Sequence, residues 1–140
     1  MGYVGMAEAK DKGKSQPLRV LIVDDDEQVL STGAEMLRVL GHEPIEALGS
    51  QEALRLIDDH PEAELLFTDI VMPAIDGITL ADMLTVQRPE MKVLYTTGYM
   101  DHAKTLPGIL HGRIMRKPYR LNELRNELEY LFPKRGARED

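Results

Sequence analysis

The feature that most constrains the fold of this chain is how four short apolar segments end. Each segment is apolar at its centre and is followed by polar or charged residues and then by a stretch with helical spacing. The four junctions are Val20–Val23 with Asp24–Asp26, Leu65–Thr68 with Asp69, Lys92–Tyr95 with Thr96–Gly98, and Arg113–Arg116 with Lys117–Pro118. Such segments are typical of strands in a parallel sheet. Because ligands of open α/β sheets bind at the carboxyl ends of the strands, the sequence predicts one polar crevice there.

The side chains expected at this crevice suit a divalent metal and a phosphoryl group. Consecutive carboxylates at Asp24–Asp26 repel one another, and a hard cation such as Mg²⁺ relieves that repulsion. A single Asp there would only complement the helix dipole. Asp69 is a candidate nucleophile that would form an acyl phosphate. Lys117 and the Thr97 hydroxyl would stabilise charge on the transferred oxygens. Ordinary alternatives are a helix cap for Asp69, a solvated Lys117 and a Thr97 that serves only the strand.

Composition narrows the class of protein. A chain of 140 residues predicts one domain. The net charge of −7 and pI near 5.1 argue against nucleic acid as a direct partner, because phosphate neutralisation needs clustered Lys and Arg. Without cysteine there is no thiolate metal site. No apolar run approaches the roughly 18 residues of a membrane span, and we expect a cytoplasmic protein without membrane contact.

The spacing of apolar residues predicts a flexible tail over 1–16, one domain over 17–133 and a short tail over 134–140. A helix after the first strand should stop at Gly41, and Pro44–Ala47 should be a poor edge strand with its proline in the first position. Ser50 is expected to cap the next helix. Pro133 should end the last helix. The segment Tyr99–Gly112 is expected to be the least ordered part of the domain, because Pro107 and Gly108 interrupt its helical pattern.

Taken together, these motifs resemble the receiver domain of two-component response regulators, of the stand-alone type similar to chemotaxis regulators. The resemblance covers about residues 18–132 and rests on four motifs that occur in order. They are V-D-D at Val23–Asp25, T-D-I-V-M-P-A-I-D-G at Thr68–Gly77, T-G-Y at Thr97–Tyr99 and K-P at Lys117–Pro118. The resemblance implies a flavodoxin-like, doubly wound α/β fold. Its sheet would have five parallel strands in the order 2-1-3-4-5, with five helices.

The resemblance also implies roles for individual residues. Asp69 would accept a phosphoryl group from a histidine kinase or phosphotransfer protein and switch an interaction face for a downstream protein, without being a turnover enzyme. Mg²⁺ would be held by Asp24, Asp25, Asp69 and the backbone carbonyl of Val71. Thr97 and Lys117 would contact the phosphoryl group, and the Lys117–Pro118 peptide would be cis.

Two positions depart from the family pattern. The triple aspartate leaves the register of the acidic pair ambiguous, and we take Asp24 and Asp25 as the pair with Asp26 as a helix-start charge. Many receivers carry Tyr or Phe three residues before the lysine, where this chain has Ile114. An aromatic flip coupled to Thr97 is therefore not expected.

Three alternatives stay open. Asp24-x-Asp26 resembles the nucleophile motif of haloacid dehalogenase phosphatases, although Gln28 stands where that motif has Thr or Val. A receiver-like scaffold that never takes phosphate is the second. The third is a receiver fragment of a larger hybrid kinase or regulator, although nothing after residue 132 could form an output domain and we expect a stand-alone receiver.

Overall fold

The computed structural model describes residues 16–98 and 110–133. The chain divides into two compact units. One unit, Leu18–Tyr119, contains the whole sheet, and the other joins Met1–Pro17 with Arg120–Asp140. The prediction of a single domain over 17–133 with a tail on either side stays a prediction.

The five strands are parallel and form one sheet in the order β2-β1-β3-β4-β5. This confirms the doubly wound α/β fold and its strand order. The switch point of such a sheet, where ligands bind, lies between β1 and β3. The strands are β1 (Arg19–Asp24), β2 (Glu43–Leu48), β3 (Leu65–Asp69), β4 (Lys92–Thr97) and β5 (Gly112–Arg116).

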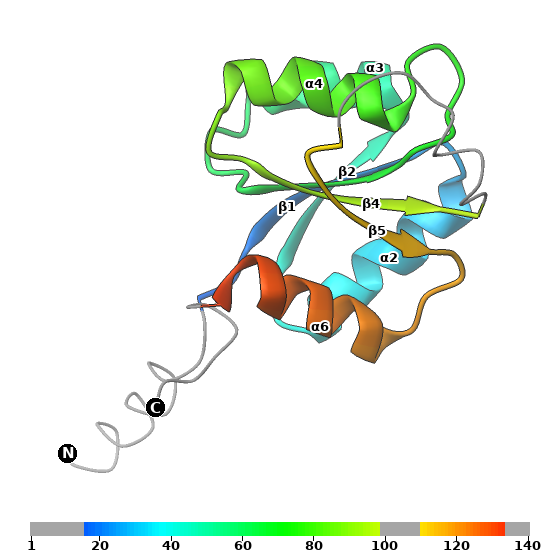
Figure 1. Ribbon diagram of the computed structural model, residues 1–140, viewed down its shortest axis with the longest axis vertical. Coiled ribbons are helices and arrows are strands. Elements are labelled where there is room, and N and C mark those ends of the chain that lie inside the picture. Colours follow the sequence, from blue (N-terminus) through cyan, green and yellow to red (C-terminus); the bar gives the residue numbers. More distant parts are fainter. Residues whose placement is uncertain (1–15, 99–109, 134–140) are drawn as a thin grey trace, which may run out of the picture. The chain divides into compact units, whose positions relative to one another are not determined.

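Helices cover both faces of the sheet. Within the larger unit, α3 (Ser50–Ile57) and α4 (Gly77–Gln87) lie on one face and α2 (Glu27–Val39) lies on the other (Figure 1). Every residue of β3 is consequently buried, which explains the apolar run Leu65–Phe67 that opens the strand. One of the five predicted helices was expected within Tyr99–Gly112, between β4 and β5, and most of that segment is residues 99–109. That part of the segment, which was also expected to be the least ordered, lies outside the described residues.

The edge strand β2 shows how its proline is tolerated. β2 pairs only with β1 in the sheet order, as predicted for an edge. Pro44 is its second residue rather than its first. The Glu43 amide donates to the carbonyl of Leu18, so alternation along the strand turns the Pro44 nitrogen away from β1. The missing N–H group therefore costs the sheet no hydrogen bond.

The helix ends follow local chemistry with one exception. α2 ends before Gly41, whose φ of 92° is the conformation that glycine favours, as predicted. The prediction that Ser50 caps α3 is wrong. Gly49 is the N-cap residue and has no side chain to accept a bond, and Ser50 is the first helical residue. Its hydroxyl donates instead to the carbonyl of Ile75, in the loop between β3 and α4.

The smaller unit contains α6 (Leu121–Leu131), which buries Leu124 and Leu128. The Arg120 amide donates to the Glu123 carboxylate at 2.6 Å and so fixes the start of the helix. The helix ends before Pro133, as predicted. None of the described helices is long and apolar enough to cross a lipid bilayer.

The pairing of β4 with β5 depends on a glycine. A Cβ atom at Gly112 would overlap the backbone carbonyl of Val93, whereas one at Gly98 would meet nothing within 4 Å. We predict that Gly112→Ala lowers the free energy of unfolding by roughly 1–3 kcal/mol, the usual effect of overpacking. Gly98→Ala should change it by less than about 1 kcal/mol. Urea unfolding followed by circular dichroism measures both, and equal values would contradict the close approach of the strands.

Candidate functional site

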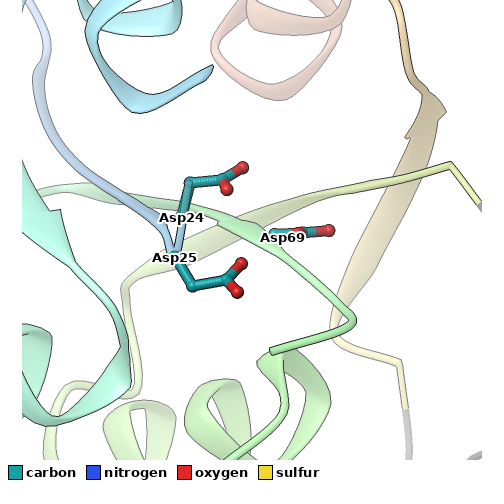
Figure 2. Close-up of side chains that lie close together, drawn as sticks. All are labelled: Asp24, Asp25 and Asp69. Atoms are coloured by element: carbon teal, nitrogen blue, oxygen red, sulfur yellow. The ribbon is translucent and has the colours of Figure 1, made fainter. Parts of the chain in front are cut away.

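Three carboxylates meet at the carboxyl ends of β1 and β3. Asp24 is the last residue of β1, Asp25 follows it, and Asp69 is the last residue of β3. The two strands are neighbours in parallel register, with Val23 opposite Thr68, so their ends lie level with each other. Figure 2 shows the three side chains gathered there. One oxygen atom from each carboxylate lies within 4.8 Å of the corresponding atoms of the other two. Asp24 and Asp69 are buried, whereas Asp25 is exposed.

Lys117 brings a positive charge to the cluster from the end of the edge strand β5. It follows β5, and its Nζ atom lies 2.9 Å from Oδ2 of Asp24 and 3.0 Å from Oδ2 of Asp69. Its backbone N–H donates to the carbonyl of Thr97 at 2.9 Å, which fixes the turn. The Lys117–Pro118 peptide is cis, as predicted.

The electrostatics of the cluster favour an added cation. Burial raises the pKa of Asp69, partly opposed by the ammonium of Lys117 and reinforced by Asp24 and Asp25. Burial would lower the pKa of Lys117, but its hydrogen bond to Asp24 and the charges of Asp69 and Asp24 outweigh it and raise this pKa. Lys117 is therefore charged at neutral pH. One ammonium does not balance three carboxylates.

Asp26 has a different task from its two neighbours. Its Oδ1 atom accepts hydrogen bonds from the amides of Gln28 at 2.9 Å and Val29 at 3.2 Å, which makes it the N-cap of α2. The Asp26 amide donates to Oδ1 of Asp24 at 2.9 Å and steadies that carboxylate. The geometry thus places Asp24 and Asp25, not Asp26, beside Asp69.

Thr97 and Val71 lie on the segments that flank the cluster. Thr97 is the buried last residue of β4, and its carbonyl holds the Lys117 turn. Val71 is half-buried in the loop after Asp69 and packs against the core. Ile114 lies opposite Tyr95 in the β4–β5 pairing.

Sequence reasoning missed Tyr119 as part of the wall of the site. Its ring packs against Phe67 with a centroid distance of 5.8 Å. A Cβ atom at Gly33 would lie 2.9 Å from the Tyr119 hydroxyl, so glycine in α2 makes room for this side chain. The signal in the sequence was a large aromatic residue directly after Lys117–Pro118 combined with a glycine inside a helix.

The donor set fits a hard divalent cation. Mg²⁺ prefers oxygen ligands and usually takes one or two carboxylates together with waters. Asp25 is exposed and Asp69 lies beside it, whereas both oxygens of Asp24 are engaged by Lys117 and the Asp26 amide. Asp25 and Asp69 are therefore suited to direct coordination, and Asp24 to a contact through water.

A doubly wound parallel sheet with an acidic cluster and a lysine at its switch point defines a class of phosphoryl-accepting α/β proteins. The chain belongs to the family described as response regulator receiver domain, whose pattern it matches over residues 20–129. Membership of this family gives no support to the haloacid dehalogenase alternative.

Individual relatives show the same similarity. The chain is 30% identical over 116 residues to the response regulator receiver protein CpdR of Brucella abortus, covering 81% of this chain and 96% of CpdR. It is 30% identical over 118 residues to the sensor kinase CckA of the same organism, covering 82% of this chain but only 12% of CckA. Its fold is similar to that of the response regulator TrrA of Thermotoga maritima, solved in complex with Mg²⁺-BeF. The TM-score is 0.73 at 25% identity, and the match covers 81% of this chain and 98% of TrrA.

The burial of Tyr119 predicts a dependence of stability on alkaline pH. Burial, with a smaller contribution from Asp24, raises the pKa of Tyr119 to about 12. An unfolded tyrosine has a pKa of about 10. The folded state holds the proton more tightly, so this contribution is fully present below pH ~10 and is lost as pH rises toward ~12.

We expect the free energy of unfolding to fall less between pH 9 and pH 11 in Tyr119→Phe than in the wild type, because phenylalanine has no proton to lose. Tyr130→Phe, at a residue that is 64% exposed, is the matched control. Urea unfolding at the two pH values measures the difference. An identical fall in the wild type and Tyr119→Phe would contradict the burial of this hydroxyl.

Proposed function

We propose that Asp69 is the phosphoacceptor of this receiver domain. The observation that carries the proposal is the convergence of Asp24, Asp25 and Lys117 on its carboxylate. Asp69 attacks the phosphorus of a phosphohistidine, the P–N bond breaks as the P–O bond forms, and the imidazole leaves. Asp25, Asp69 and the Val71 carbonyl would hold Mg²⁺, and Asp24 would contact it through water. The bound ion would neutralise charge on the transferred group.

Lys117 is placed to shift its contact from the Asp69 carboxylate to the phosphoryl group that Asp69 receives. Its ammonium lies 3.0 Å from Oδ2 of Asp69, so a small displacement lets it donate to a phosphoryl oxygen. Its backbone is tied to the carbonyl of Thr97, whose hydroxyl we assign to a second phosphoryl oxygen. The two contacts couple occupancy of Asp69 to the ends of β4 and β5, which provides the switch.

The phosphodonor is a histidine kinase or a phosphotransfer protein, and the output is a downstream protein target in the cytoplasm. A groove of about 480 Å³ runs between α2 and the turn after β5. Asp26 and Lys117 lie in its wall, and Val29, Met36 and Tyr119 give it an apolar lining. Lys117 lines the groove and contacts Asp69, so a donor protein bound in the groove would present its histidine close to Asp69.

Asp69→Asn should abolish phosphoryl labelling, because an amide is not nucleophilic. Incubation with Mg²⁺ and acetyl phosphate followed by intact-mass measurement detects the added phosphoryl group. Asp59→Asn, at an exposed residue after α3, should label like the wild type. Persistent labelling of Asp69→Asn would overturn the assignment. A wild-type protein that takes no label would favour the scaffold, and turnover without an adduct would favour a phosphatase.

Asp25→Ala should mainly weaken Mg²⁺ binding, whereas Asp26→Ala should mainly lower the free energy of unfolding. Asp25→Ala should weaken Mg²⁺ binding by at least roughly tenfold, since losing even an outer partner of a metal site has effects of this size. It should not destabilise the metal-free protein, because it removes like-charge repulsion. Asp26→Ala removes the N-cap of α2 and should lower the free energy of unfolding by about 1 kcal/mol while leaving Mg²⁺ affinity nearly unchanged.

Isothermal titration calorimetry with MgCl₂ and urea unfolding separate these two effects. Equal losses of Mg²⁺ affinity in the two variants would mean that the acidic pair is in the other register.

A further inference from the structure

A hydroxyl outside the acidic cluster ties down the loop that follows the phosphoacceptor. Ser50 is the first residue of α3 and is only 4% exposed. Its Oγ atom donates to the backbone carbonyl of Ile75 at 2.6 Å. Ile75 belongs to the loop between β3 and α4, which begins directly after Asp69 and contains Val71. The bond therefore links the start of α3 to the loop of the site.

The loop is strained at the point where this bond holds it. Ala74 has a φ of 68°, which a residue with a Cβ atom adopts only at a cost. The Ile75 amide donates to the carbonyl of Pro73 at 2.8 Å and closes a tight turn around Ala74. Turns of this kind are rare and persist only where surrounding contacts enforce them. The Ser50 hydroxyl is such a contact.

The base of the loop is fixed separately. The Gly77 amide donates to the carbonyl of Ile70 at 2.8 Å, and a Cβ atom at Gly77 would overlap the carbonyl of Asp69. The loop is thus held at its base by backbone contacts and near its tip by Ser50. Val71 lies between the two anchors. A shift of the tip would be transmitted to the Val71 carbonyl and to the backbone of Asp69.

We propose that Ser50 is a positioning residue for the phosphoacceptor site, acting through the Ile75 carbonyl on the placement of Val71 and Asp69. The inference rests on the proposed Mg²⁺ and phosphoryl chemistry of Asp69. Without the hydroxyl, the Ile75 carbonyl loses its donor and the turn at Ala74 relaxes. The oxygens that would surround the cation then no longer share one fixed geometry, and binding becomes weaker.

Ser50→Ala tests this role, because it removes the hydroxyl with little change in volume. Thr85→Val is the matched control. It removes a hydroxyl that donates to the Ala81 carbonyl at 2.7 Å inside α4, keeps the side-chain shape, and leaves the loop untouched. Calorimetric titration with MgCl₂ gives the affinity. Amide hydrogen exchange of Ile75 and Gly77 in the metal-free protein reports the loop itself, and acetyl phosphate labelling reports the chemistry.

We expect Ser50→Ala to raise the Mg²⁺ dissociation constant by roughly fivefold, the effect of one net hydrogen bond, and to accelerate exchange at Ile75 and Gly77. Thr85→Val should match the wild type in both. Wild-type affinity and exchange in Ser50→Ala would overturn the inference even if Asp69 is labelled normally. Equal losses in the two variants would also overturn it. If the wild type takes no phosphoryl group, the proposed function fails, while weaker Mg²⁺ binding by Ser50→Ala would still support the role of Ser50.

Discussion

The ammonium of Lys117 lies within 3.0 Å of carboxylate oxygens at the ends of β1 and β3, and it arrives there from β5. These contacts connect three strands of the sheet at the edge where the strands end. Removing the ammonium would leave Asp24 and Asp69 buried together without a counter-charge, which is far more unfavourable than the loss of a surface ion pair. The close approach of the buried carboxylates therefore depends on this lysine, whose single charge still leaves the cluster negative enough to favour a divalent cation.

Much of this arrangement follows from the sequence, because it depends on local rules. Buried parallel strands read as apolar runs, so the ends of β1, β3, β4 and β5 and the side chains after them can be assigned from the sequence alone. Strand order and the proximity of Asp24, Asp25, Asp69 and Lys117 then follow from the resemblance to receiver domains. The position of Pro44 was misjudged because pattern rules place a strand end only to within a residue or two.

Contacts between segments distant in sequence were beyond such rules. Ser50 before a helical stretch reads as a cap, and only the structure shows that Gly49 takes that position while the hydroxyl reaches Ile75. Tyr119 and Gly33 likewise meet only because α2 lies on the same face as the turn after β5. In both cases the missed interaction positions residues next to the site and does not involve the carboxylates or the lysine themselves.

The central claim is that Asp69 is the carboxylate on which phosphoryl chemistry occurs, with Lys117 and Mg²⁺ beside it. A crystal structure of the protein with Mg²⁺ and beryllofluoride, a mimic of the phosphoryl group, tests this most directly. We expect beryllofluoride on a carboxylate oxygen of Asp69, a fluorine within hydrogen-bond distance of Lys117 Nζ, and Mg²⁺ bound by Asp25 and Asp69. Beryllofluoride on another carboxylate, or an Asp69 that stays unmodified with Mg²⁺ and beryllofluoride in excess, would contradict it.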